Sequence, residues 1–506
     1  MRKRYLLTGV GLLLFLNLPY VIALAITDQK YMFGGFLLNP VDGYTYLAKI
    51  LQGRLGNWLF TLPYSAEPNQ GAPIFWFYLL LGHLSRWLNV SPVFTFHLAR
   101  FLSSIALLVS LKIFFESLFA NRPQIAFWAY LMTILGSGCG WLASLAGIIT
   151  SDFWVAEAYP FLAMYSSPHF SLGLALLIWF VSKLLIAKSV KTGWILSGAG
   201  LLLSIILPFG IVIAALVALG DVLISIAWKE KAKYQTIIAF LLPGGLFILY
   251  QFFIIRTDPV LAQWDAQNLT VSPPVWDILV SFSPLLVFAV YGGVKTFIHR
   301  HRQLMILVVW LVLGLLLIYV PFNLQRRFML GYMIPVAGLA AYGLSEVDFR
   351  WKRPLRLALL IATLPTIFIV ILGGLMAVRN SDPHLVINRD EMDAFVFLVE
   401  SSGCDDLILA SPETGLLIPA FTGRRVIYGH PFETVDGAKA KMDVEAFFNA
   451  SMNAESVEWA REKHVKWVFW GPREHDYGKL PDELPKGLLM LYQNESVRLF
   501  RLQDKE

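Results

Sequence analysis

Long apolar runs dominate this chain and leave few folds open to it. A helix needs about 20 consecutive apolar residues to cross a bilayer, because the membrane offers no water to exposed backbone groups. The first run covers 5–26, and further runs lie at roughly 92–119, 124–148, 167–187, 193–208, 209–228, 234–255, 275–297, 303–320, 327–346 and 354–377. The sequence therefore predicts a polytopic α-helical membrane protein with about eleven spans.

The composition agrees with a membrane protein and excludes other classes of chain. Of the 506 residues, 57% are hydrophobic and 15% are charged, whereas soluble domains average about 45–50% apolar and about 25% charged residues. The net charge is +13 up to residue 377 and −7 from residue 378 to 506. A basic membrane region is thus followed by an acidic tail in a different solvent. The basic residues are scattered rather than gathered in one stripe, so nucleic acid is not an expected partner.

Basic clusters predict the orientation of the spans, because Lys and Arg accumulate in cytoplasmic connections. The chain begins Met1-Arg2-Lys3-Arg4, and basic clusters recur in alternate connections at 183–191, 229–233, 295–302 and 350–356. We expect an uncleaved first helix, a cytoplasmic N-terminus and a plasma-membrane location. The connections at 149–166, 256–274 and 321–326 and everything after 377 should then lie outside the cell.

Two segments complicate this topology. Residues 73–90 are apolar but contain Gly82, His83 and Arg86, and the parity of the spans favours an interfacial or re-entrant helix on the outer side. Pro208-Phe209-Gly210 interrupts the region 193–228, which can be read as two spans or as one kinked span.

The tail has the composition of a soluble domain. We predict strands in 406–411, 424–429 and 465–470, helices in 413–421 and 443–464, and a closing hairpin around Gln493-Asn494. This order predicts a small extracytoplasmic α/β domain at 378–506, after a membrane domain at 1–377 that carries an exterior loop at 27–91.

Asp42 is the acid with the most suggestive context. It stands in Asn39-Pro40-Val41-Asp42-Gly43-Tyr44-Thr45-Tyr46-Leu47-Ala48-Lys49, where Pro40 favours a helix start in the first exterior loop. A carboxylate there could take a proton from a hydroxyl group, and the aromatic faces of Tyr44 and Tyr46 suit sugar rings. The alternative is that Asp42 only caps a surface helix.

This motif resembles the first exterior loop of the GT-C class of integral-membrane glycosyltransferases, which includes protein O-mannosyltransferases, aminoarabinose transferases and oligosaccharyltransferase catalytic subunits. The resemblance covers the layout of about 1–377. It implies a GT-C-like fold, a polyprenyl-phosphate sugar donor and inverting displacement, with Asp42 as the general base.

A second exterior segment, 149–170, holds Asp152 and Glu157 among aromatic residues, and Pro168-His169 follows at the start of the next run. Some GT-C members carry a second acidic motif here. By that resemblance, Asp152 or Glu157 could orient the acceptor or hold a divalent metal, and His169 could contact substrate. The alternatives are an interfacial aromatic belt with solvated acids and a histidine that only starts a helix.

Arg326 and Arg327 stand outside, against the bias that keeps basic residues inside. A phosphate at the outer interface would explain them, because guanidinium groups bind phosphate in a bidentate manner. Arg256, at the outer end of another run, is a weaker companion. The alternative is that these side chains only reach lipid head groups.

Other motifs carry less. Gly136-Ser137-Gly138-Cys139-Gly140 lacks the Lys-Ser/Thr of a phosphate loop and favours close helix packing instead. Gly429-His430-Pro431 in the tail could touch a sugar or acceptor, although a turn between strands explains it as well. No His/Cys cluster has zinc spacing. No cofactor is certain, and a divalent metal is possible.

The sequence therefore favours a membrane glycosyltransferase whose acceptor is a lipid, a glycan or a protein. A transporter or flippase of lipid-linked saccharides and a catalytically inactive GT-C scaffold are the alternatives.

Overall fold

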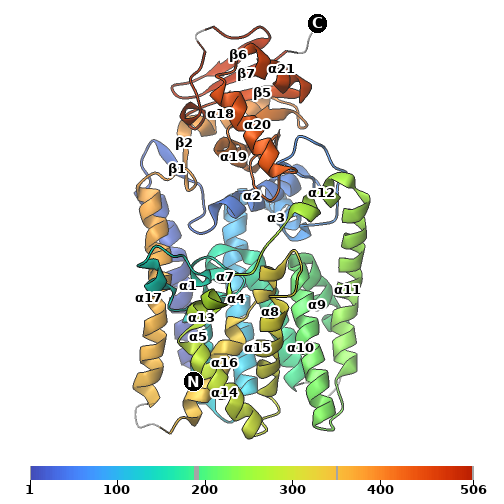
Figure 1. Cartoon of the computed structure of the whole chain (residues 1–506), viewed down its shortest axis with the longest axis vertical. Helices are drawn as coiled ribbons and strands as arrows, with labels where there is room; N and C mark the ends of the chain where they lie inside the picture. The colour runs from blue at the N-terminus through green and yellow to red at the C-terminus, as the bar shows by residue number, and fades with distance from the viewer. Residues whose placement is uncertain (1, 187–192, 349–351, 482, 504–506) are drawn as a thin grey trace. The chain divides into compact units, whose positions relative to one another are not determined.

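The computed structural model describes residues 2–186, 193–348, 352–481 and 483–503. Contacts divide the chain into two compact units. Figure 1 shows the helices and strands, coloured along the chain. Unit 1 comprises Met1–Pro19, His97–Tyr250 and Thr270–Gly374, and unit 2 comprises Tyr20–Phe96, Gln251–Leu269 and Leu375–Glu506. Lys188, Lys191 and Arg350, which the sequence assigns to cytoplasmic clusters, lie outside the described residues.

The prediction of a polytopic helical membrane protein is confirmed. Within the described ranges, eight helical segments are long and apolar enough to cross a membrane. They are α1 (Arg2–Ile26), α4 (Pro92–Leu118), α5 with α6 (Pro123–Leu135, Gly140–Ser144), α8 (Pro168–Ile186), α10 (Pro208–Ala227), α11 (Tyr234–Thr257), η2 with α16 (Gln325–Met329, Met333–Glu346) and α17 (Lys352–Arg379).

The remaining apolar runs differ from the eleven regular spans that the sequence predicts. Helices α13 (Val275–Phe282) and α14 (Leu285–Ile298) are bent by 90° at their junction and would count together as a ninth span. Helices α9 (Gly193–Ile206) and α15 (Met305–Leu317) are apolar, but their described lengths are 14 and 13 residues, below the usual spanning length of about 20. Pro208 starts α10 directly after Leu207, so the run 193–228 forms two helices.

Helix α16 forms the centre of unit 1. It packs against α14 on one side and α5 on another, and 94% of its apolar window is buried. Such a helix is apolar all round because every face contacts other helices.

In unit 2, helix α2 (Pro40–Leu55) packs closely against α3 (Trp76–Leu88). The approach requires glycine: a Cβ atom at Gly53 would lie 2.1 Å from the carbonyl oxygen of Leu79, and one at Gly82 would lie 2.1 Å from that of Ile50. Helix α3 has 13 residues, so the segment 73–90 is too short to cross the membrane as a helix, as expected. Its place on the outer side stays a prediction.

The tail has the small α/β fold that the sequence predicts. Its five-stranded sheet has the order β4-β3-β5-β7-β6, with β4, β3 and β5 parallel and β7 and β6 antiparallel. The strands are β3 (Leu407–Leu409), β4 (Arg425–Val426), β5 (Val465–Trp470), β6 (Leu488–Gln493) and β7 (Arg498–Leu502), and the helices are α18 (Arg389–Ser401), α19 (Pro412–Thr422), α20 (Gly437–Asn449) and α21 (Ala454–Glu462). The predicted helix at 443–464 is therefore two helices.

The segment 27–91, predicted as the first exterior loop, belongs to the same compact unit as the tail. Strand β1 (Tyr31–Phe33) pairs antiparallel with β2 (Val386–Asn388), and the Val426 N–H donates a hydrogen bond to the Pro63 carbonyl at 3.0 Å. Sequence periodicity gives no sign of these long-range pairings. A division into domains near residue 377 stays a prediction. Residues 27–91 contact both the tail and the segment 251–269.

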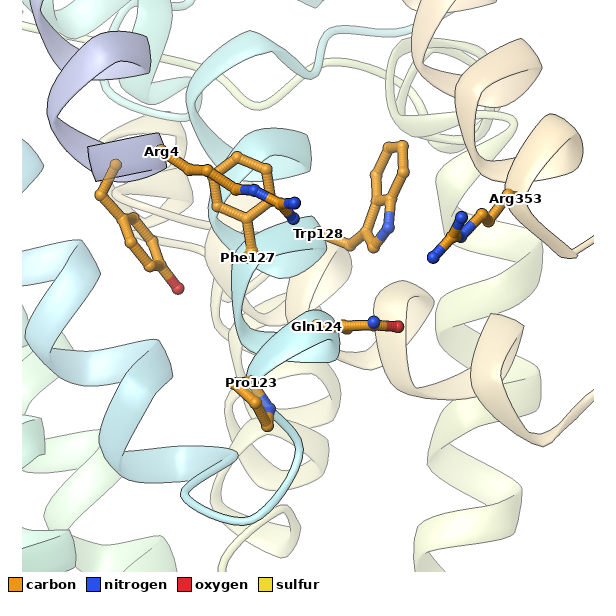
Figure 2. Close-up of a pocket in the computed structure, with 7 residues that line it drawn as sticks. Arg4, Pro123, Gln124, Phe127, Trp128 and Arg353 are labelled. Carbon is orange, nitrogen blue, oxygen red and sulfur yellow. The ribbon is translucent and has the colours of Figure 1, made fainter. Parts of the chain in front are cut away.

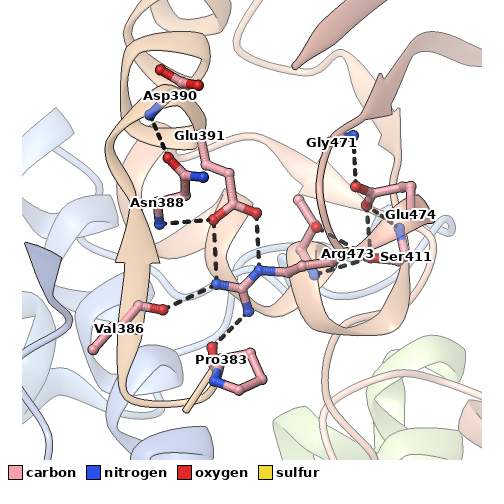
Figure 3. A network of polar contacts seen from close by, with 10 residues as sticks. Pro383, Val386, Asn388, Asp390, Glu391, Ser411, Gly471, Arg473 and Glu474 are labelled. Atoms are coloured by element: carbon pink, nitrogen blue, oxygen red, sulfur yellow. Dashed lines mark hydrogen bonds and ion pairs between the residues drawn. The ribbon is translucent and has the colours of Figure 1, made fainter. Parts of the chain in front are cut away.

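A buried ion pair fixes the start of the tail (Figure 3). The Arg473 guanidinium contacts the Glu391 carboxylate at 2.9 and 3.3 Å and donates to the carbonyl oxygens of Pro383 and Val386. Beside it, in the short helix η3 (Glu474–Asp476), the Glu474 carboxylate accepts hydrogen bonds from the backbone of Ser411 and Gly471. Burial raises the pKa of Glu474 above its ordinary value.

We predict that Arg473→Met destabilises the tail by about 3–5 kcal/mol, because it leaves the Glu391 carboxylate buried without its cation. Adding Glu391→Gln should recover part of the loss, since a neutral amide oxygen can still accept from Asn388. The control is Arg501→Met, which removes a partly exposed pair with Asp406 and should cost less than about 1 kcal/mol. Protease susceptibility of the tail against temperature, in the full-length protein, measures these effects. Equal stability of the Arg473 and Arg501 variants would contradict the assignment.

Candidate functional site

Asp42 lies in the first turn of α2, a position that the predicted capping role does not fit. The residue before the helix is Asn39, with φ 51°, and Pro40 is the first helical residue. The Asp42 carbonyl accepts a hydrogen bond from the Thr45 hydroxyl at 2.9 Å. Its side chain is 45% exposed, and the N-terminal end of the helix dipole favours its negative charge. Asp42 therefore presents a carboxylate that a substrate can reach, and it is not the N-cap.

His430 faces this carboxylate from the loop 427–436, which follows β4. Its Nε2 lies 3.5 Å from Asp42 Oδ1, and its side chain is only 4% exposed. Nδ1 accepts the backbone N–H groups of Phe432 and Glu433, both at 3.1 Å. Because Nδ1 accepts, the ring proton lies on Nε2, the nitrogen that faces Asp42. The loop backbone thus selects the tautomer that aims an N–H at the acid.

A buried lysine lies on the same side of α2, seven residues after Asp42. Lys49 is 0% exposed, and its Nζ lies 2.5 Å from Glu433 Oε1 and 3.2 Å from the Thr45 hydroxyl. The ammonium group also lies 4.4 Å from the centre of the Phe75 ring, a distance at which the ring face attracts a cation. The Lys49–Glu433 pair is therefore charge-neutral and enclosed.

Glu433 nevertheless keeps one free oxygen. Its Oε2 atom is buried and has no hydrogen-bond partner among the described residues, although the residue as a whole is 9% exposed. A buried acceptor without a donor is costly. Since Oε1 already contacts Lys49, Oε2 can accept a neutral donor such as a hydroxyl group.

Helix α12 (Pro259–Gln267) holds the loop that carries His430 and Glu433. The Gln267 side chain donates to the Thr434 carbonyl and accepts the Asp436 N–H at 3.0 Å. The Gln267 amide thus forms hydrogen bonds to two residues of the loop, Thr434 and Asp436, which restricts the movement of the loop beside α2.

The two tyrosines expected to bind sugar occupy different environments. Tyr44 is 0% exposed, and its ring centre lies 5.4 Å from that of Phe36 and 6.1 Å from that of Phe421. Burial raises the pKa of Tyr44 well above its ordinary value. Tyr44 is therefore a core residue, and the expected sugar contact does not fit. Tyr46 is only partly buried and stacks on Tyr78 at 4.6 Å.

Arg256 does not join this group. It is exposed near the end of α11, and its guanidinium lies 5.0 Å from the ring centre of Phe252 on the same helix. This contact within one helix fits an interfacial side chain better than a phosphate ligand.

In unit 1, the structure brings together Glu157, Arg326 and Arg327, three of the predicted site residues. Glu157 Oε1 lies 3.5 Å from Arg326 Nε and 3.4 Å from Arg327 Nη1. The Arg326 guanidinium also lies 4.6 Å from the ring centre of Trp154. One carboxylate faces two guanidinium groups, so the group carries a surplus positive charge.

Backbone contacts place this basic group. The Gly331 N–H donates to the Glu157 carbonyl at 2.8 Å, and the Arg326 N–H donates to the Thr270 carbonyl at 3.0 Å. The acid and the arginines thus lie on segments that are hydrogen-bonded to neighbours on both sides. The Arg326 and Arg327 side chains remain 20% and 26% exposed.

Asp152 is buried and fully hydrogen-bonded, whereas a residue that binds an acceptor or a metal needs an accessible carboxylate oxygen. It lies in η1 (Ser151–Phe153) and is 1% exposed. Its Oδ1 accepts from Thr150 at 2.6 Å and faces Ser281 at 3.3 Å, and its Oδ2 accepts from Thr366 at 3.0 Å and from the N–H groups of Gly138 and Gly140 at 3.1 and 3.2 Å. Both oxygens are occupied, so Asp152 is a structural acid here.

The glycine-rich segment 136–140 brings its backbone N–H groups within hydrogen-bonding distance of this carboxylate. A Cβ atom at Gly140 would lie 2.0 Å from Asp152 Oδ1, and one at Gly138 would lie 2.1 Å from the Ser281 carbonyl. The two N–H groups form a small anion-binding nest between α5 and α6. Burial raises the pKa of Asp152 above its ordinary value of 3.8, and these hydrogen bonds oppose part of that rise.

His169 is the second residue of α8, directly after Pro168, and is 9% exposed. Its ring lies 4.0 Å from the Phe170 ring. This placement matches a residue at a helix start, and it leaves little of the ring open to a substrate.

Among the described residues, no three His, Cys, Asp or Glu side chains come together as metal ligands would.

Lys49 and Glu433 were not among the predicted site residues. His430 was considered only as a possible sugar or acceptor contact within Gly429-His430-Pro431, and not as a partner of Asp42. Lys49 could have been found by its position on the helical face of Asp42. His430 and Glu433 follow a predicted buried strand, a common position for functional side chains, but nothing local in the sequence connects them with α2.

No sequence family model matches this chain, and no curated protein sequence matches it. Solved structures do resemble it. ArnT from Cupriavidus metallidurans in the apo state aligns with 99% of this chain and 98% of its own, at 11% identity and a TM-score of 0.51. The same protein bound to undecaprenyl phosphate has the same coverage, 10% identity and a TM-score of 0.50.

The arabinofuranosyltransferase AftD from Mycobacteria aligns with 100% of this chain but only 40% of its own, at 13% identity and a TM-score of 0.53. Identities this low carry information on the fold alone. The chain has a GT-C-like fold, as the resemblance of its first exterior loop implies.

Proposed function

We propose that this protein is a membrane glycosyltransferase that moves a sugar from a polyprenyl-phosphate donor to an acceptor hydroxyl by inverting displacement. The observation that carries the proposal is the half-exposed Asp42 carboxylate beside the N–H of His430, on a GT-C-like fold. A related fold bound to undecaprenyl phosphate supports the class of donor. We place the reaction on the outer face of the plasma membrane, with the N-terminus cytoplasmic.

Asp42 acts as the general base. The acceptor hydroxyl gives its proton to the carboxylate while its oxygen bonds to the anomeric carbon. The bond from that carbon to the phosphate oxygen breaks, and its electron pair leaves with the phosphate. The configuration inverts because the hydroxyl attacks opposite the leaving group.

His430 is a positioning residue for this step. Its Nε2–H faces Oδ1, so it orients the carboxylate that receives the proton. Because Nδ1 accepts two backbone N–H groups, the ring cannot turn over without losing both hydrogen bonds.

Glu433 Oε2 supplies an acceptor for a sugar or acceptor hydroxyl. Lys49 already neutralises this carboxylate at 2.5 Å, so the enclosed pair favours a neutral polyol over an ion. The lysine is needed because a buried carboxylate without a cation would destabilise the folded protein.

Arg326 and Arg327 hold the phosphate. A leaving phosphate needs positive charge rather than a proton, and these two guanidinium groups provide it beside the Glu157 carboxylate. Glu157 then keeps the two guanidinium groups together and takes no proton in the reaction.

The first test is Asp42→Asn. Turnover should fall about a hundredfold or more, the usual contribution of a general base, while stability changes by about 1 kcal/mol or less because the side chain is half exposed. Release of polyprenyl phosphate from a panel of donors, with purified protein, measures turnover. The control is Asp393→Asn, an exposed acid on α18, which should transfer at the wild-type rate. A folded Asp42→Asn protein with wild-type turnover would remove Asp42 as the base.

A second test concerns the phosphate. We predict that Arg326→Gln/Arg327→Gln weakens donor binding by about a hundredfold or more, since each of the two lost charged hydrogen bonds costs about 1.5–3 kcal/mol. Arg256→Gln is the matched control and should leave donor affinity unchanged. Equilibrium binding of a polyprenyl-phosphate sugar gives the comparison. Equal effects of the two replacements would assign all three arginines to lipid head groups.

The third prediction separates Asp152 from the catalytic acids. In Asp152→Asn, the new NH₂ group must face hydrogen-bond donors, either the N–H groups of Gly138 and Gly140 or the Thr150 hydroxyl. Two donors facing each other cannot hydrogen-bond, which should cost about 1–3 kcal/mol of stability. Because burial raises the folded pKa of Asp152, the wild-type protein loses stability as pH rises through that pKa, and the Asn variant should lack this slope.

Thermal unfolding in detergent from about pH 4 upward measures the Asp152 effect, and turnover per folded molecule should stay near wild type. A fully stable Asp152→Asn protein without turnover would instead make Asp152 a reacting group.

A further inference from the structure

A cavity of about 210 Å³ lies in unit 1, at the end where three helices begin (Figure 2). Its lining comes from the first turns of α1, α5 and α17: Arg4, Tyr5, Pro123, Gln124, Phe127, Trp128 and Arg353. None of these residues has a part in the proposed glycosyl transfer.

The charges around this cavity favour an anion. Arg4 and Arg353 both line it, and no carboxylate does. Within the described part of the chain, neither guanidinium forms an ion pair with an acid. The starts of α1, α5 and α17 add the positive ends of three helix dipoles. Two unpaired guanidinium groups are well suited to the oxygens of a phosphate.

The wall of the cavity is amphipathic. Figure 2 shows the Trp128 ring between Arg4 and Arg353, with the Gln124 side chain below it. The Tyr5 ring packs edge-on against Phe127 at 5.1 Å. Tyr5 is 4% exposed, and its hydroxyl is buried without a hydrogen-bond partner among the described residues. The wall thus contains an unused donor besides the two cations.

The surface next to the cavity is apolar. Leu6 and Leu7, which follow the cavity residues on α1, are 66% and 72% exposed, and Leu357, one turn after Arg353, is 50% exposed. Exposed leucines on spanning helices face lipid chains. A phosphate in the cavity would therefore lie beside a surface suited to acyl chains.

We infer that this cavity binds the phosphate of an anionic membrane phospholipid. The two arginines contact the phosphate oxygens, Gln124 and the Tyr5 hydroxyl can donate to it, and Trp128 packs against the glycerol region. By the orientation expected from the sequence, this lipid would belong to the cytoplasmic leaflet.

The test compares Arg4→Gln/Arg353→Gln with Lys3→Gln/Lys231→Gln in the full-length protein. The control pair removes the same charge from exposed residues that do not line the cavity. Native mass spectrometry in detergent measures binding of phosphatidylglycerol, phosphatidylcholine and inorganic phosphate. We expect phosphatidylglycerol to bind the wild type and the control pair equally within about twofold, and the arginine variant at least about tenfold more weakly.

Phosphatidylcholine should bind more weakly than phosphatidylglycerol, because its choline cation would lie near the two arginines. Arginine-dependent binding of inorganic phosphate without binding of phosphatidylglycerol would keep the phosphate site but assign it to a soluble ligand. Phosphatidylglycerol binding that survives in the arginine variant, or that falls equally in the control pair, would overturn the inference.

Discussion

The cost of holding charge away from water governs this molecule. A chain with so many apolar spans can keep an ionised side chain in its interior only where an opposite charge or several hydrogen bonds compensate for lost hydration. The structure meets this requirement with Lys49–Glu433 and Arg473–Glu391 in unit 2, and with Asp152 in a nest of backbone N–H groups in unit 1. These compensated charges fix α2, the tail and the break between α5 and α6.

The degree of compensation separates structural from candidate functional groups. Asp152 and Glu474 have donors on both carboxylate oxygens, so neither has capacity left for a substrate. Asp42 is half exposed, and Glu433 keeps an unsatisfied oxygen. The same reasoning applies to cations. Arg473 is matched by Glu391 and two carbonyls, whereas Arg326 and Arg327 share one acid, and Arg4 and Arg353 line a cavity without any.

Local sequence patterns predict the elements of this fold better than their meeting points. Long apolar runs predict the spanning helices, and short apolar runs predict β3, β5 and the β6–β7 hairpin, because these depend on neighbours in the sequence. The 90° bend between α13 and α14, the pairing of β1 with β2 and the approach of His430 to Asp42 depend on partners far apart in the chain. The sequence singles out Asp42 by its place at a helix start. It does not predict that Asn39, and not Asp42, is the N-cap residue.

Charge balance also assigns the two halves of the proposed reaction to different groups. A lysine near a candidate base invites the role of phosphate ligand, but Lys49 is already neutralised at 2.5 Å by Glu433 and is fully buried. A neutral pair with one open oxygen recognises hydroxyl groups, and a surplus cation recognises phosphate. An acceptor hydroxyl needs a carboxylate as its base, and a leaving phosphate needs a cation. If the base and the cation formed an ion pair with each other, neither would be available to the substrate. Asp42 faces the N–H of His430, and the two arginines face Glu157, so the acid and the positive charge are held by different groups.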